Sequence, residues 1–119
     1  MVQVMKKVRR GVRLTPEGRV EEECLEYLNR NGFYAFKVKS TGTFDRASGQ
    51  YRKSSPYEVN GVSDILAIRS GVTFYIEVKT DRGYQSADQK KFQCAVERAD
   101  AIYVVVRSVE ELKDYVRYW

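Results

Sequence analysis

Residues 61–79, Gly-Val-Ser-Asp-Ile-Leu-Ala-Ile-Arg-Ser-Gly-Val-Thr-Phe-Tyr-Ile-Glu-Val-Lys, decide the fold of this chain. The apolar run Ile65–Ile68 predicts one strand, and the polar Arg69–Gly71 predicts a tight turn because glycine accepts the backbone angles of a reversal. From Phe74 to Lys79 apolar and other residues alternate, which predicts a second strand with one apolar face. The stretch therefore reads as a β-hairpin.

The opposite face of the second predicted strand carries Glu77 and Lys79, whose side chains project side by side because they are two residues apart. If the two strands pair, Asp64 comes close to Glu77. Two carboxylates offer hard oxygen ligands for Mg²⁺ or Mn²⁺, and an adjacent lysine can orient water or stabilise negative charge. A turn aspartate and a solvated Glu-x-Lys pair are the plainer interpretation, which the hairpin alone leaves open.

Composition bounds the class of protein. The 119 residues fit one domain, and a hydrophobic fraction of 43% excludes a disordered tail. No apolar run is long enough for a membrane span and no signal peptide follows Met1, so we expect a cytoplasmic protein. Cys24 and Cys94 lack CxxC spacing and are expected to be reduced and structural. The absence of histidine excludes His-dependent triads and almost any zinc enzyme.

The net charge of +5 is concentrated in a basic arm, residues 1–14, which contains no acidic residue. The positive and negative charges of the remaining residues cancel. Such an arm suits contact with a nucleic-acid backbone, and equally a solubilising terminus. Its basic residues are Lys6, Lys7, Arg9, Arg10 and Arg13.

A helix is predicted from about Pro16 to Asn31, with Thr15 as its N-cap. Helical spacing places Glu17 and Glu21 on the same face as the apolar stripe Val20, Cys24, Tyr27 and Leu28. Acidic residues on such a face are costly unless they are paired or bind a metal. Glu17 also favours the helix N-terminus electrostatically, which is its plainer explanation.

A strand over 33–38 is followed by a long polar segment, residues 40–60, which we expect to be a functional or mobile loop. Cations interleaved with aromatic residues suit phosphates and unstacked bases, and a surface hairpin is the alternative. These residues are Lys39, Arg46, Arg52 and Lys53, with Phe44, Tyr51 and Tyr57.

The C-terminal half predicts a helix, a strand and a helix. Ser86 and Gln89 form a capping box that opens a helix ending near Ala99, and residues 101–106 form a buried strand. Ser108 and Glu111 form a second capping box, opening a helix to residue 119. The order α-β-β-β-α-β-α predicts an α/β fold with a sheet covered by helices.

These segments resemble the VRR-NUC family of virus-type replication-repair nucleases, within the PD-(D/E)XK superfamily. The resemblance runs from Glu17 to about Val109. Its motifs are the helix Glu17…Leu28, the Gly42–Lys53 loop, Gly61-Val62-Ser63-Asp64, Ile76-Glu77-Val78-Lys79-Thr80 and Ser86-x-x-Gln89-x-x-Phe92. Two positions depart from the pattern: Ser63 replaces a proline, and Glu21 stands where relatives often carry glutamine.

The resemblance implies a restriction-endonuclease-like αβββαβ core, with a mixed central sheet flanked by helices, over residues 15–119. It implies an endonuclease that uses Mg²⁺ or Mn²⁺ and acts on branched DNA. Asp64 and Glu77 would bind the metal, with the Val78 carbonyl and Glu17 completing its ligands. Glu21 is the alternative to Glu17. Lys79 would orient or activate the attacking water, Gln89 would position Lys79 or a phosphate, and Ser86 would join the basic residues in DNA contact.

The preferred substrate is a Holliday-type four-way junction cut by a homodimer, since symmetrical junctions need two cuts. Tyr115, Tyr118 and Trp119 would serve the dimer interface, or would simply belong to the core. Two alternatives stay open: a monomeric nuclease directed to flaps or nicks, and a DNA-binding module without turnover. A bacterial or phage origin is expected.

Overall fold

The computed structural model describes residues 14–38, 43–52 and 55–119. Its secondary structure comprises α1 (Pro16–Arg30), β1 (Tyr34–Lys37), β2 (Thr43–Asp45), β3 (Gln50–Arg52), β4 (Ile65–Arg69), β5 (Val72–Val78), α2 (Ala87–Arg98), β6 (Ile102–Val106) and α3 (Val109–Val116). The helices and strands predicted outside residues 40–60 are present in the predicted order, whereas β2 and β3 were not predicted. The basic arm lies outside the described residues, except for Leu14.

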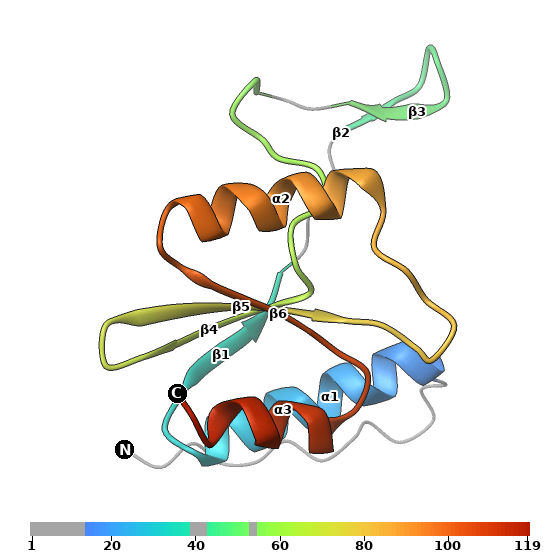
Figure 1. Cartoon of the computed structure of the whole chain (residues 1–119). Coiled ribbons are helices and arrows are strands. Elements are labelled where there is room, and N and C mark those ends of the chain that lie inside the picture. The colour runs from blue at the N-terminus through green and yellow to red at the C-terminus, as the bar shows by residue number, and fades with distance from the viewer. Residues whose placement is uncertain (1–13, 39–42, 53–54) are drawn as a thin grey trace.

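A four-stranded mixed sheet, in the order β1-β4-β5-β6, forms the centre of the molecule. The β1–β4 and β4–β5 pairs are antiparallel, and the β5–β6 pair is parallel because α2 connects these two strands. Helices α1 and α3 cover one face of the sheet and α2 lies over the other (Figure 1). β5 is therefore an inner strand, covered on both faces.

The predicted hairpin at residues 61–79 is confirmed. Arg69 pairs with Val72, so Ser70 and Gly71 form a two-residue loop. Both have positive φ, 53° and 78°, as a type I′ turn requires. The register pairs Ile65 with Ile76, which places Asp64 directly across from Glu77.

The hydrophobic core lies between the sheet and the α1–α3 layer. It includes Cys24 and Leu28 of α1, Phe33 before β1, and residues of β4, β5, β6 and α3. Trp119 joins it, stacking on Phe74 with ring centroids 4.2 Å apart. Core packing therefore accounts for Trp119, whereas Tyr118 is 86% exposed.

The helix starts follow the predicted capping chemistry, with one difference. The Thr15 hydroxyl accepts the Gly18 N–H, and Ser86 and Gln89 form the reciprocal capping box of α2. At α3 the Ser108 hydroxyl accepts the Glu111 N–H, but the Glu111 carboxylate accepts from Arg107 N instead of Ser108 N. The second capping box is therefore displaced by one residue, and α3 ends at Val116, earlier than expected.

The 40–60 segment is not the structureless loop that we expected. β2 and β3 pair as an antiparallel hairpin that lies beyond α2 in Figure 1. Phe44 pairs with Tyr51 across the two strands, and short-range pairing of this kind satisfies backbone groups without help from the core. The segment therefore contains the surface hairpin that was weighed as the alternative, and its contact with nucleic acid stays a prediction.

Two further expectations have plain outcomes. Cys24 and Cys94 are both free thiols, but Cys94 is exposed, so only Cys24 has a structural place in the core. Within residues 14–38, 43–52 and 55–119, the helices are all too short or too polar to span a membrane.

Candidate metal and DNA site

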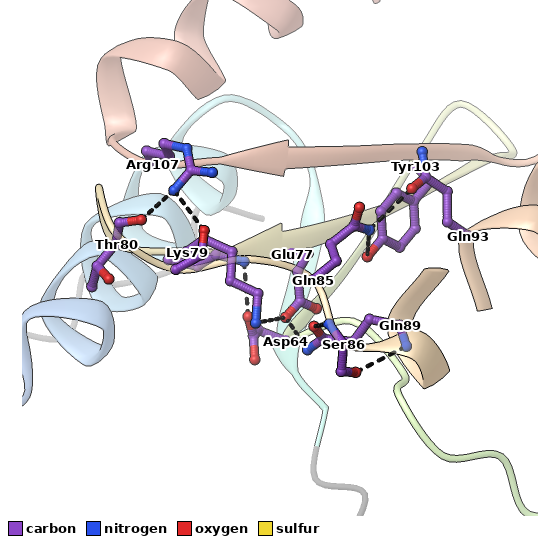
Figure 2. A network of polar contacts seen from close by, with 12 residues as sticks. Asp64, Glu77, Lys79, Thr80, Gln85, Ser86, Gln89, Gln93, Tyr103 and Arg107 are labelled. Carbon is purple, nitrogen blue, oxygen red and sulfur yellow. Dashed lines mark hydrogen bonds and ion pairs between the residues drawn. The ribbon is translucent and has the colours of Figure 1, made fainter. Parts of the chain in front are cut away.

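Asp64 and Glu77 meet at the end of the β4–β5 hairpin because they occupy opposite positions in the antiparallel register. The Asp64 carboxylate accepts the backbone N–H of Val78 at 2.8 Å, so its orientation is fixed by β5 itself. Glu77 is 1% exposed. Figure 2 shows the side chains of Asp64, Glu77, Lys79 and Gln89 converging at this point. The predicted proximity of the two carboxylates is confirmed.

One oxygen of Glu77 has both an ion-pair partner and a hydrogen-bond donor. Lys79 Nζ lies 3.6 Å from Glu77 Oε1, and Gln89 Nε2 donates to the same oxygen at 2.7 Å. Among the described residues no donor reaches the other oxygen, Oε2, although it is buried. A buried carboxylate oxygen without a donor is costly, unless a cation accepts its charge.

Burial and, next, the neighbouring Asp64 carboxylate together raise the pKa of Glu77 to about 8, against the lowering effect of Lys79. In the metal-free protein Glu77 therefore keeps its proton at neutral pH, because its ionisation would place a second negative charge beside Asp64. A cation placed between them would relieve both the repulsion and the desolvation.

Gln89 is placed by the start of α2. Its Oε1 accepts the Ser86 N–H at 2.8 Å in the capping box, so its amide N–H₂ must face Glu77. The hydrogen bond reaches Glu77 and not Lys79, which differs from the expected partner. Ser86 itself is exposed, and its hydroxyl accepts the Gln89 backbone N–H.

Gly61 brings the strand and the helix together. Its φ is +77°, and a Cβ at this position would lie 2.5 Å from the backbone carbon of Asp88. Only glycine permits this close approach of the Gly61–Asp64 segment to the start of α2. The packing sets Gln89 against Glu77.

The two candidate acids of α1 have different surroundings. Glu21 is buried and pairs with Lys37, with Glu21 Oε2 2.8 Å from Lys37 Nζ. Burial raises the pKa of Glu21, and the proximity of Asp64 contributes. Glu17 is half-buried and acts on Glu77 only through its charge, as the weakest of the influences on the pKa of Glu77.

The turn after β5 is held by Arg107, which sequence reasoning missed. Its Nη1 donates to the carbonyl oxygen of Thr80 (Figure 2) and to that of Gly83, and Gly83 packs beside the Lys79 side chain. Gln85 further ties this loop to the core by donating to Gln93 and to the Tyr103 hydroxyl. Nothing in the sequence marks these long-range contacts.

Lys37 was also missed, although the alternation of β1 carries a signal. Phe33, Ala35 and Lys37 share one face, and the first two are buried. A lysine that continues an inward-facing row predicts a buried acidic partner nearby.

Most of the predicted DNA-contacting residues lie outside the described residues: Lys6, Lys7, Arg9, Arg10, Arg13, Lys39 and Lys53. For Arg52 the structure describes the backbone, in β3. Arg46 is exposed in the turn between β2 and β3.

A divalent cation fits this site in its donor chemistry. The two facing carboxylates and the unpartnered Glu77 Oε2 are hard oxygen donors, which Mg²⁺ and Mn²⁺ prefer. In the part of the chain that the structure describes, no cluster of three or more His, Cys, Asp or Glu residues is arranged to hold a metal. The residues present therefore suit an ion that keeps several water ligands, as Mg²⁺ does.

The mixed four-stranded sheet, its helices and the Asp…Glu-x-Lys arrangement define the restriction-endonuclease-like class of α/β folds. No family model and no curated protein matches the sequence. Among solved structures, one described as "VRR_NUC domain" superposes with a TM-score of 0.67 at 21% sequence identity. The match covers 89% of this chain and 99% of that chain. The chain has the VRR-NUC fold.

Proposed function

We propose that this protein is a nuclease of the PD-(D/E)XK type that hydrolyses phosphodiester bonds in DNA and requires Mg²⁺ or Mn²⁺. The observation that carries this proposal is the cross-strand placement of Asp64 opposite Glu77, with Lys79 Nζ 3.6 Å from the Glu77 carboxylate. The VRR-NUC fold, shared with the solved structure described as "VRR_NUC domain", supports the proposal.

Asp64 and Glu77 would hold the cation directly, with the Val78 carbonyl as a third ligand. Glu17 would complete the ligands directly or through water, since Glu21 is already engaged by Lys37. When bound, the cation would lower the pKa of a coordinated water and shield the charge developing on the phosphate.

The remaining roles belong to side chains of this chain. Lys79 would orient or activate the attacking water, and the Glu77 carboxylate limits where its ammonium lies. Gln89 keeps Glu77 in place through the hydrogen bond to Oε1. Ser86, the hairpin residues around Arg46 and the basic arm would contact phosphates, where each contact adds to the salt dependence of binding.

The substrate that we favour is a four-way junction, cut by a homodimer with one strand per active site. The test is cleavage of a labelled junction beside linear duplex and flap DNA, in Mg²⁺, Mn²⁺ or EDTA. We expect paired symmetric cuts that EDTA abolishes. Lys79→Ala should lower the cleavage rate by roughly 10²- to 10⁴-fold, the usual contribution of a positioned proton-transfer group.

Matched variants separate the site from general effects. Lys91→Ala removes an exposed lysine of α2, and Asp114→Asn removes an exposed acid of α3. Both should cleave like the wild type, whereas Asp64→Asn should not cleave. Full activity of Lys79→Ala would overturn the assignment, and binding without cleavage under any metal would leave a DNA-binding module. Cleavage of flaps alone would replace the junction as the substrate.

A further inference from the structure

The ion pair between Glu21 of α1 and Lys37 of β1 has no role in the proposed chemistry. Lys37 Nζ lies 2.8 Å from Glu21 Oε2. The side chain of Glu21 is 8% exposed and that of Lys37 is 58% exposed. The carboxylate is thus almost fully withdrawn from water, while the lysine reaches it from the solvent side.

This pair adjoins the two facing carboxylates. Lys37 is opposite Ile65 in the β1–β4 register, and the next residue, Val38, donates its N–H to the Asp64 carbonyl at 2.8 Å. Burial raises the pKa of Glu21 and the hydrogen bond to Glu21 raises the pKa of Lys37, and the Asp64 charge adds to both increases. Glu21, Asp64 and Glu77 therefore form one acidic neighbourhood, and Lys37 enters it from β1.

The buried Glu21 and Glu77, with the half-buried Asp64 between them in the chain, need more than one positive charge if all three are ionised. Lys79 faces Glu77, and Lys37 faces Glu21. A second divalent cation on the Glu21 side would have to displace the Lys37 ammonium, which already neutralises that carboxylate.

We propose that Lys37 takes the place of a second divalent cation, so that each site binds a single ion, held by Asp64 and Glu77. Glu21 then serves as the anchor of Lys37 and not as a metal ligand. This inference rests on the proposed function, because it presumes the divalent cation of that site.

The test is Mn²⁺ binding to the full-length protein without DNA, measured by calorimetry for stoichiometry and by electron paramagnetic resonance for the bound ion. The wild type should bind one Mn²⁺ per chain, and Asp64→Asn should remove it. Lys37→Met leaves the buried Glu21 charge uncompensated, so this variant should bind a second ion or bind the first roughly tenfold more tightly. Glu21→Gln leaves the Lys37 charge uncompensated and should weaken binding by roughly tenfold.

The double variant Glu21→Gln/Lys37→Met distinguishes an anchor from a ligand. If Glu21 anchors Lys37, removing both charges restores one ion with an affinity within about threefold of the wild type. If Glu21 is itself a ligand, the double variant stays as weak as Glu21→Gln, and the inference is wrong. Lys91→Met, an exposed lysine of α2, should match the wild type, and Lys37→Arg should restore single-ion binding.

Two ions in the wild type, or an unchanged affinity in both Lys37→Met and Glu21→Gln, would overturn this inference while leaving the nuclease proposal intact. Absence of any Mn²⁺ binding that depends on Asp64 would instead contradict the metal site of the proposed function. Thermal melts of each variant identify those that fail to fold. Because the double variant replaces the ion pair by uncharged side chains of similar length, it decides the question if Lys37→Met unfolds.

Discussion

At the scale of the residue, the chemistry depends on Glu77. Its side chain is buried on an inner strand, shares one oxygen between Lys79 and Gln89, and leaves the other without a donor among the described residues. A carboxylate in such a place is destabilised in its charged form by burial and by Asp64. A bound cation offsets this destabilisation of the charged carboxylate, and carboxylates with a raised pKa are typical of functional sites.

The raised pKa of Glu77 predicts how stability depends on pH in the metal-free protein. The pKa is about 8 in the folded chain against an ordinary value of 4.5, so the folded state holds the extra proton between these values. Stability should therefore fall as pH rises from 4.5 to 8, and then level off. Thermal melts in EDTA from pH 5 to pH 9 measure this slope.

Glu77→Gln is the matched variant for that measurement. It cannot lose a proton, so its melting temperature should fall much less over the same range, with a residual slope from Glu21, whose pKa is also raised. Mg²⁺ should raise the melting temperature of the wild type most at high pH, because the ion binds the deprotonated carboxylates. An identical slope in Glu77→Gln and wild type would contradict the assignment.

At the scale of the element, the site is built by packing a turn and a helix start against the end of the hairpin. Gly61 lets the segment before β4 touch the backbone of α2, and Arg107 fixes the turn after β5. Among the described residues, Gly61 packs against α2 and Arg107 donates to Thr80 and Gly83, so neither contacts the facing carboxylates directly. Their effect passes through Gln89 and Lys79.

Gly61→Ala should destabilise the fold and displace Gln89 from Glu77. The added Cβ would lie 2.5 Å from the Asp88 backbone, and the positive φ adds strain. Gly71→Ala is the control, because its φ of 78° is nearly the same and its Cβ would meet open space. We expect a loss of about 1 kcal/mol for Gly71→Ala and more for Gly61→Ala, by denaturant unfolding. Equal losses of stability in the two variants would show that the contact of the added Cβ with α2 does not destabilise the fold.

Arg107→Gln should lower the turnover number for DNA cleavage by roughly tenfold with little change in DNA affinity, because the turn beside Lys79 loses two hydrogen bonds. Arg98→Gln, an exposed arginine at the end of α2, is the matched control. Steady-state kinetics and DNA binding in EDTA separate the two quantities. A weakened DNA affinity with unchanged turnover would mean that Arg107 contacts DNA instead.

At the scale of the whole molecule, α2 covers only part of its face of the sheet. It packs on β6, and Phe92 contacts Tyr75 and Tyr103. On β1 and β4 the side chains of Tyr34, Phe36 and Ile68 are exposed, with Tyr34 at 61%. Apolar side chains gathered in this way often mark an interface.

The proposed homodimer therefore has two candidate contact surfaces, this sheet face and the C-terminal residue Tyr118. Sedimentation of Tyr34→Lys and Tyr118→Lys at micromolar concentration distinguishes them, since a charge at the contact should convert the dimer to monomer. Lys113→Gln on α3 is a control for changed surface charge. A wild type that sediments only as monomer would contradict the homodimer.

Local rules made much of this fold predictable. Alternation in residues 72–79, the Ser-Gly turn and the caps at Thr15 and Ser86 act over a few residues, so they can be recognised in the chain order itself. The facing of Asp64 and Glu77 follows from the same register. The strands β2 and β3 in the 40–60 segment were not predicted, because their short sequences lack a core-facing pattern. The contact of Gln89 with Glu77 was not predicted either, because it depends on how α2 packs on the sheet.

The sequence by itself determined the helices and strands outside residues 40–60, their order and the cross-strand carboxylate pair, because each depends on neighbours in the chain or on one hairpin register. Only the tertiary structure decided that Glu21 is neutralised by Lys37, that Arg107 holds the turn beside Lys79, and that Gly61 touches α2. These contacts join residues 16 to 27 positions apart, and their partners are selected by packing, which no local pattern records.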